Sequence, residues 1–275
     1  MPDWIVAHEA GARGGAFALV LLLMLAAEAL WSRRAGPMGR QQRWSANLSL
    51  VVIDTVLARL LIPLGASGAA LWAAGRGFGA LNMVEGPPLL EAAFAFLALD
   101  AAIYWQHRLF HRIPTLWRLH RMHHSDLEFD ATTGVRFHPL EILVSMLIKL
   151  AVVTLLGAPA AVVIAFEIAL NATSLFNHGN LRLPAALDRV LRRIVVTPDM
   201  HRVHHSVHRR EHDSNYGFNL SWWDHLFRSY AAQPQDGHTT MRIGLPGFRE
   251  PADQQLVPLL LQPLRHPGES RGPVS

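Results

Sequence analysis

Cysteine is absent from this 275-residue chain. Its absence excludes disulfide frameworks, thiolate zinc sites, iron–sulfur clusters and cysteine nucleophiles. Charged residues are also scarce, at 17% of the chain against roughly 25% in ordinary globular domains. Hydrophobic residues reach 51%, which excludes disorder for most of the length and argues against a freely soluble protein.

Lysine is nearly absent as well, since Lys149 is the only one in the chain. The net charge of +4 therefore comes almost entirely from arginine. A basic chain can bind nucleic acid, but these arginines flank apolar runs and form no basic face interleaved with aromatic residues. We therefore predict no nucleic-acid partner and interpret the arginines as flanks of membrane spans.

Long apolar runs predict about four to five membrane-spanning helices, because one span needs about 20 mostly apolar residues. The short turn at Gly157, Ala158 and Pro159 joins the last two runs into a helical hairpin. After Asn177 no run is long enough, so we expect the C-terminal hundred residues to lie outside the bilayer. The predicted fold class is an all-α integral membrane bundle with spans at 15–31, within 46–74, at 89–106, at 139–156 and in a fifth run ending near 176.

Arginines in the short loops predict the orientation of these spans. Four of them follow the first span and five lie within 107–138, whereas the loop after the second span carries only Arg76. The arginine-rich side should be the cytoplasm, and most histidines fall on that side. The alternative for the first run is a cleaved signal peptide ending near Ala27, Glu28 and Ala29, but a basic leader before the run is missing.

Histidines gather in three boxes of helical spacing. His107 and His111 are four residues apart, while His120, His123 and His124 stand at i, i+3 and i+4. Pro114 is placed to begin the helix that carries the second box. A third box repeats the spacing of the second, and its helix is predicted to begin with Thr197 as N-cap and Pro198 as first helical residue. Each box should direct its imidazoles at one point. The members of the third box are His201, His204 and His205.

Eight imidazoles exceed the four ligands of a structural zinc site, so two metals with open positions fit better. Imidazole suits zinc, copper, iron and nickel, so ligand type does not choose the metal. Asp100 and Tyr104 continue the stripe of His107 and His111, and we expect Asp100 to accept a hydrogen bond from an imidazole. Polar residues inside other apolar runs should form pairs within the bundle, namely Asp54, Arg59 and Glu167.

These residues resemble the membrane fatty acid hydroxylase/sterol desaturase superfamily over about residues 90 to 230. The matching segments are Asp100-x3-Tyr104-Trp105-x-His107-Arg108-x2-His111, Leu116-Trp117-Arg118-x-His120-x2-His123-His124, Arg136-x-His138-Pro139-x-Glu141, Asn177-His178-Gly179-Asn180, Thr197-Pro198-x2-His201-Arg202-Val203-His204-His205, Asn215-Tyr216-Gly217 and Trp223-Asp224-x2-Phe227.

The resemblance implies an oxo-bridged diiron centre on a cytosolic, histidine-rich helical cap above a membrane bundle. It carries the ligand role onto the eight box histidines and onto His178 as a ninth. His138 is better interpreted as an anchor for the helix beginning at Pro139. Asp100, Tyr104, His138 and Asp224 would stand behind the ligands. The chain departs from many relatives at His225 and at Phe227-Arg228-Ser229, so the resemblance does not carry over a substrate class.

The resemblance predicts an oxygen-dependent lipid hydroxylase or desaturase, with hydroxylation favoured. Two irons would be the cofactor, with zinc an alternative occupant after purification, and we expect metal loss below about pH 6.5. Electrons would come from a separate ferredoxin or cytochrome b5-type donor, because no haem or flavin domain is visible. We expect membrane helices at 1–88, a catalytic domain at 89–235 and a poorly ordered tail at 236–275.

Two alternatives from other classes stay open on the residues. An integral-membrane zinc hydrolase would use metal-bound water and need neither oxygen nor reductant. A metal-handling membrane protein would place metal-binding residues along the spans, whereas these histidines cluster at one face.

Overall fold

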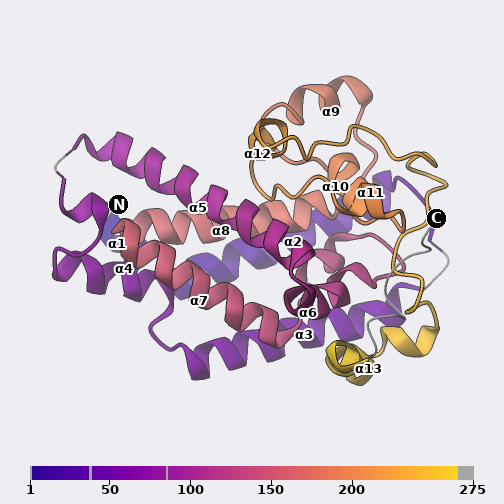
Figure 1. The fold of residues 1–275 in the computed structure, drawn as a ribbon, viewed down its shortest axis with the longest axis horizontal. Coiled ribbons are helices and arrows are strands. Elements are labelled where there is room, and N and C mark those ends of the chain that lie inside the picture. Colours follow the sequence, from indigo (N-terminus) through magenta and orange to yellow (C-terminus); the bar gives the residue numbers. More distant parts are fainter. Residues whose placement is uncertain (1, 37–38, 85, 266–275) are drawn as a thin grey trace.

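The computed structural model describes residues 2–36, 39–84 and 86–265, and within them the regular secondary structure is helical, with three isolated β-bridges besides. Long helices form an elongated bundle, and shorter helices and loops form a cap at one end of it (Figure 1). The long helices are α2 (Glu9–Trp31), α3 (Arg40–Leu61), α5 (Pro88–Arg112), α7 (Pro139–Leu156) and α8 (Ala160–Asn177).

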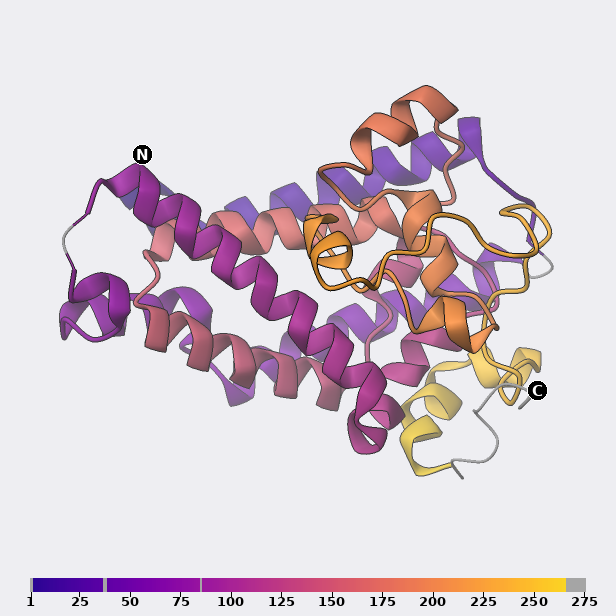
Figure 2. The same cartoon turned by 45° about the horizontal axis from the view of Figure 1, so that its top comes forward.

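The predicted spans are confirmed in number and near position, because five segments are long and apolar enough to cross a membrane. Their outer surface is apolar as lipid contact requires: Leu22, Leu60 and Leu90 are each at least 65% exposed. Figures 1 and 2 show α2, α5 and α8 running toward the cap, and α3 and α7 running away from it. The arginine-rich loops therefore share the cap end with the histidine boxes.

The second span differs from the single run expected within 46–74. It breaks after α3 at Ile62, where Pro63 follows, and resumes as α4 (Gly65–Gly75). Proline cannot continue the hydrogen-bond ladder, and Gly65 adopts a positive φ of 62° that favours glycine. The small side chains of α4 then pack closely against α7 and α8 in a cluster that includes Ala66, Ala70, Val153, Val163 and Phe166.

Local signals at the ends of α7 agree with the prediction. The Nδ1 atom of His138 accepts a hydrogen bond from the backbone N–H of Leu140 at 3.1 Å, so His138 is the expected anchor at the N-cap. Gly157 ends α7 in the left-handed conformation, and Pro159 precedes α8. The hairpin turn is therefore built from three residues of special backbone preference.

Of the polar residues inside the spans, Glu167 behaves as predicted. It pairs with Lys149 at 2.6 Å and with Arg13 at 3.1 Å, which joins three helices inside the bundle. Asp54 is buried, but Arg59 is exposed on the last turn of α3, so the expected role of Arg59 in an interior pair is wrong. A long arginine near a helix end can reach the interface, which removes the need for a buried partner.

The C-terminal segment is ordered as far as residue 265, so its expected poor order is wrong there. Leu259 and Gln262 are fully buried, and Leu259 packs with Leu50 and Met122 beneath the cap. Arg121 donates hydrogen bonds to the backbone carbonyls of Gln262 and Arg265. The apolar run at 256–261 covers core surface that would otherwise face water. Residues 266–275, including His266, lie outside the described residues.

The remaining elements are short. At the bundle end opposite the cap lie α1 (Pro2–Ala7) and η1 (Ala80–Asn82). The cap and the C-terminal segment consist of α6 (Pro114–His124), η2 (Ala131–Val135), α9 (Ala185–Leu191), α10 (Pro198–His204), α11 (Arg209–His212), α12 (Trp222–Leu226), η3 (Pro251–Gln254), α13 (Leu256–Leu261) and η4 (Gln262–Leu264).

Candidate metal centre

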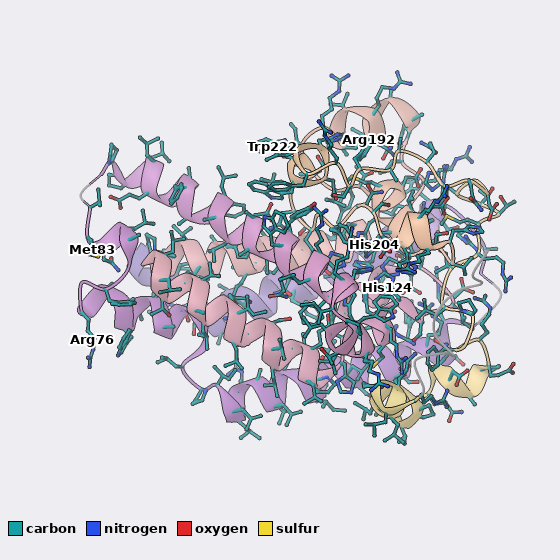
Figure 3. All side chains as sticks on the ribbon, viewed as in Figure 1. Arg76, Met83, His124, Arg192, His204 and Trp222 are labelled. Carbon is teal, nitrogen blue, oxygen red and sulfur yellow. The ribbon has the colours of Figure 1, made fainter. Side chains whose placement is uncertain are left out.

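All nine predicted histidines converge at the base of the cap, and their side chains are buried. They come from α5, α6, the end of α8 and α10; Figure 3 shows His124 and His204 together there, and their rings are 4.6 Å apart. Their nitrogens form two groups, and within each group one nitrogen per residue lies within 4.8 Å of the others. The first group is His107, His111, His120, His124 and His204, and the second is His123, His178, His201 and His205.

Each three-histidine box contributes to both groups, which corrects the expectation that a box converges on one point. His120 and His124 belong to the first group, whereas His123 belongs to the second. On a helix, positions i and i+4 are about 40° apart, while i+3 lies about 60° to the other side. The third box divides in the same way, because His201 and His205 share a group and His204 joins the other.

In the first group, hydrogen bonds orient the rings. The Nδ1–H groups of His107 and His204 donate to the backbone carbonyls of Tyr216 at 2.7 Å and Ser214 at 2.6 Å. The Nδ1–H of His120 donates to Glu141 Oε1 at 2.6 Å. With Nδ1 as donor, each Nε2 carries a lone pair, and these three Nε2 atoms are buried without a hydrogen-bond partner. Such atoms are costly unless a metal ion binds them.

The second group is equally suited to a cation. The Nε2 atom of His178 lies 3.1 Å from Nε2 of His123 and 3.0 Å from Nε2 of His201. The Nδ1–H of His178 donates to the Ser174 carbonyl at 2.7 Å, which leaves its Nε2 as an acceptor. Facing lone pairs at this distance repel one another unless a shared proton or a metal ion lies between them.

Burial keeps the histidines of the two groups that lie outside the spans neutral, which is the form that binds metal. It lowers the pKa of His120 and of His178 to about 3. For five more members of the two groups, burial and the neighbouring imidazoles hold the pKa well below its ordinary value; these are His123, His124, His201, His204 and His205.

Asp100 does not accept from an imidazole, so that prediction is wrong. Its Oδ2 accepts hydrogen bonds from Trp223 Nε1 at 2.8 Å and from the Leu220 backbone N–H at 3.2 Å. Asp100 therefore ties α5 to the loop that leads into α12. The sequence pattern shows only that Asp100 shares a helix face with His107 and His111. The loop that contacts Asp100 is distant in sequence, so this contact could not be predicted from the pattern.

Asp224 and Tyr104 act at a distance from the rings. Asp224 accepts from the backbone N–H groups of Tyr216 and Gly217, both at 2.8 Å. It thereby positions Tyr216, whose backbone carbonyl accepts the hydrogen bond from His107. The Tyr104 hydroxyl lies 2.8 Å from the hydroxyl of Ser229, which is also bonded to Asp224. These residues fix the loop at 215–229 against α5.

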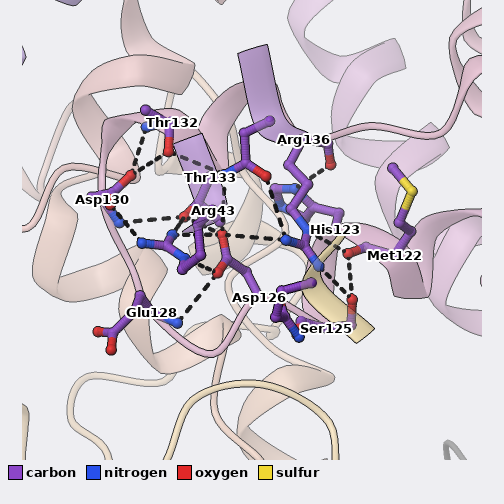
Figure 4. Close-up of polar contacts among 12 residues, drawn as sticks. Arg43, Met122, His123, Ser125, Asp126, Glu128, Asp130, Thr132, Thr133 and Arg136 are labelled. Carbon is purple, nitrogen blue, oxygen red and sulfur yellow. Dashed lines mark hydrogen bonds and ion pairs between the residues drawn. The ribbon is translucent and has the colours of Figure 1, made fainter. Parts of the chain in front are cut away.

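A buried ionic network holds the segment that follows α6 (Figure 4). Arg43 on α3 donates to Asp126 and to Asp130, each at 2.7 Å. The carbonyl of Arg136 is 3.3 Å from His123 Nδ1, and its Nε–H donates to the Met122 carbonyl at 3.0 Å. The network therefore links α3 to a histidine of the second group.

Sequence reasoning missed two contributors to the site. Arg43 was interpreted only as a topology residue, and the signal that could have exposed it is the pair of aspartates just after the second box. Glu141 was part of a matching segment without a role, although its place three residues after His138 puts it in the first turn of α7. The Ser214 and Tyr216 carbonyls carry no side-chain signal.

His212 and Asp213 adjoin the first group near solvent. With His111 they form a third set of nitrogen and oxygen atoms within 4.8 Å of one another. The His212 ring stacks on Trp117 at 5.3 Å, and Trp117 also contacts the rings of His111 at 5.1 Å and His124 at 5.4 Å. Trp117 is half-buried, so it connects the histidine cluster to the cap surface.

Comparison with known proteins agrees with this site. Residues 92–229 match the model of the fatty acid hydroxylase family, and the chain belongs to that family. The match covers three of the five spans and every histidine of the two groups. A chain of this family with five apolar helices is a multi-pass membrane protein. No solved structure is significantly similar to the chain.

Three curated relatives illustrate the similarity. Ornithine lipid hydroxylase OlsE of Rhizobium tropici is 30% identical over 157 residues, which are 57% of this chain and 46% of the relative. Human alkylglycerol monooxygenase is 28% identical over 144 residues, covering 50% and 30%. Very-long-chain aldehyde decarbonylase GL1-5 of Oryza sativa subsp. indica is 26% identical over 199 residues, covering 69% and 29%. The chain thus spans less than half the length of each.

Proposed function

We propose that this protein is a membrane-bound non-haem diiron oxygenase that hydroxylates a C–H bond of a lipid, using O2 and external electrons. The observation that carries the proposal is the division of nine buried histidines into a group of five and a group of four. Residues 89–235 would form the catalytic domain, residues 1–88 the N-terminal membrane helices and residues 236–275 a C-terminal segment, which packs against the rest of the chain in its described part. The arginine flanks support a cytoplasmic cap.

The first group would hold one iron and the second group the other. When bound, the irons would supply O2 activation and C–H cleavage. The chain's own residues do the rest: Glu141 and the carbonyls of Ser214 and Tyr216 hold three ring N–H groups, so the opposite nitrogens face inward. Burial keeps the rings neutral and excludes bulk water. Because the cluster lies where the bundle meets the cap, the lipid chain would reach it from the bilayer side.

Hydroxylation with O2 needs two electrons and two protons, giving the alcohol and one water. We propose that an acidic redox protein supplies the electrons at the cap surface around Trp117. That indole contacts two histidines of the first group, and Arg112, Arg209 and Arg210 are exposed on the neighbouring elements. Complementary charge would steer an acidic donor there.

The names of the relatives favour hydroxylation over desaturation, and they suggest an ornithine lipid or an ether lipid as substrate. We would express the protein and the His204→Ala/His205→Ala variant in cells supplied with isotopically labelled O2, and then analyse the lipids by mass spectrometry. A lipid carrying one labelled oxygen, found only with the intact protein, would support the proposal. Products with an added double bond and no label would instead indicate desaturation.

Metal content tests the site itself. Protein purified in detergent from iron-replete cells should contain about two irons per chain, and the His204→Ala/His205→Ala variant markedly fewer. His225→Ala is the matched control, because His225 is an exposed cap histidine outside both groups. Metal unchanged in the double variant would overturn the site. Stable zinc with no iron, even after reconstitution with ferrous iron, would favour a hydrolase instead.

A further inference from the structure

Two cap helices expose a continuous apolar surface. Leu187, Val190 and Ile194, on α9 and the turn after it, are 45–58% exposed, and Trp222 and Leu226 on α12 are 46% and 65% exposed. We call these five residues the α9–α12 face.

The two halves of this face are joined by hydrogen bonds. Trp222 Nε1–H donates to the Arg193 carbonyl at 3.0 Å, and the Ser221 backbone N–H donates to the Ile194 carbonyl at 3.1 Å. The face is therefore one surface and not two separate exposed patches.

The charges around this face are of one sign. Asp188 is the only acidic residue between 182 and 194, and it is buried against Arg192 and Thr197. Arg182, Arg189 and Arg193 are exposed. An apolar surface flanked by arginines and lacking exposed carboxylates has the composition of a helix that lies in a membrane interface.

The position of the face along the spans also fits a surface that lies in a membrane interface. Trp223, next to Trp222, donates to Asp100, which lies twelve residues before the end of α5. Twelve helical residues correspond to about 18 Å along the axis. The backbone N–H of Arg182, just before α9, donates to the carbonyl of Trp31 at the end of α2. Figure 2 shows α9 beside the cap end of α2 and α12 beside α5.

A cleft at the start of α9 adds a place for an anion. It has a volume of about 290 Å³ and is lined by Arg33, Arg182, Leu183, Pro184 and Ala185. Arg33 is paired with Asp199 at 3.0 Å, so the exposed Arg182 guanidinium beside the apolar wall is the group that suits a lipid phosphate whose acyl chains continue along the neighbouring spans.

We propose that the α9–α12 face is seated in the interfacial layer of the bilayer that the spans cross, with anionic phospholipid headgroups against Arg182, Arg189 and Arg193. The side chains of Leu187, Val190 and Leu226 enter the acyl boundary, and Trp222 lies at headgroup level. The face then holds the cap against the membrane. This proposal needs neither metal nor enzymatic activity.

The lack of native cysteine allows a direct test. Single variants Val190→Cys and Leu226→Cys would carry a nitroxide, with Arg209→Cys as the control, because Arg209 is an 81%-exposed cap residue on α11. The measurement is made in phosphatidylcholine nanodiscs containing phosphatidylglycerol. The spin relaxation of labels at 190 and 226 should be accelerated by O2 and little affected by a water-soluble nickel chelate. The label at 209 should show the reverse. Equal nickel access at all three positions would overturn the proposal.

A second measurement tests the charges and a competing occupant. The triple variant Arg182→Gln/Arg189→Gln/Arg193→Gln should retain less phosphatidylglycerol per chain after extraction than wild type, whereas Arg76→Gln at the opposite end should not. Retention equal to wild type in the triple variant would refute the lipid contact. Dipolar broadening between labels at 190 that disappears on dilution with unlabelled protein would show that a second copy covers the face, and it too would refute the proposal.

Discussion

His123 and His124 are neighbours in the chain, yet they belong to different groups of the histidine cluster. The His124 ring packs against that of His204 at 4.6 Å, whereas Nε2 of His123 faces Nε2 of His178. A single turn of α6 therefore contributes side chains to both groups and holds them next to each other.

Substituting these neighbours should affect different metals. We expect His124→Ala to weaken the first group and His123→Ala the second, each lowering iron from about two per chain toward about one. Mössbauer spectra of the two variants should then differ, because the remaining iron has a different ligand set. Identical residual spectra would contradict the division into two groups.

Glu141 should tune the affinity of the first group. Because it receives the Nδ1–H of His120 at 2.6 Å, Glu141→Ala should weaken iron binding by about 10- to 100-fold, and Glu141→Gln by less. Competition with a graded series of iron chelators would measure the change. Glu91→Gln, at the far end of α5, is the control; an Ala variant that binds as tightly as that control would remove Glu141 from the site.

The buried ionic network should contribute to stability through Arg43. Arg43→Met leaves Asp126 and Asp130 without their main counter-ion in a buried site, so we expect a loss of about 3–5 kcal/mol in the free energy of unfolding. Arg40→Met, one turn earlier and exposed, should change it by about 0.5 kcal/mol or less. Unfolding in detergent, followed by tryptophan fluorescence, compares them. Equal effects would show that the network is not needed.

The metal-free protein should lose stability in acid. In the folded chain the pKa of His120 and of His178 is about 3, whereas an unfolded histidine has a pKa of about 6.5. The unfolded chain therefore binds more protons between these values. The contribution of the neutral rings is complete above about pH 6.5 and declines as the pH falls toward about 3.

The low pKa of the folded histidines changes the expectation, drawn from the sequence, that metal is lost below about pH 6.5. Because the folded rings stay neutral well below pH 6.5, metal loss near that pH would have to follow from unfolding and not from titration of folded ligands. The unfolding midpoint and the bound iron should fall together as the pH is lowered. Iron lost while the fold is still intact near pH 6 would contradict this explanation.

The sequence by itself determined the spans and the eight box histidines on their cap side, because hydrophobic runs and helical spacing are local properties, whereas His178 was indicated only by the family resemblance. The same holds for the beginnings of α6, α7 and α10, each marked by proline at the first helical position. His138 was placed correctly for that reason.

Tertiary structure alone decided how the histidines divide and what holds them. The second group joins His123, His178 and His201 from three elements, and Asp100 bonds to Trp223, more than a hundred residues away. The carbonyl acceptors on the 214–216 loop and the docking of the segment at 256–264 likewise depend on contacts between distant residues. Such contacts arise from the packing of whole helices, for which no local pattern in the chain is a signal.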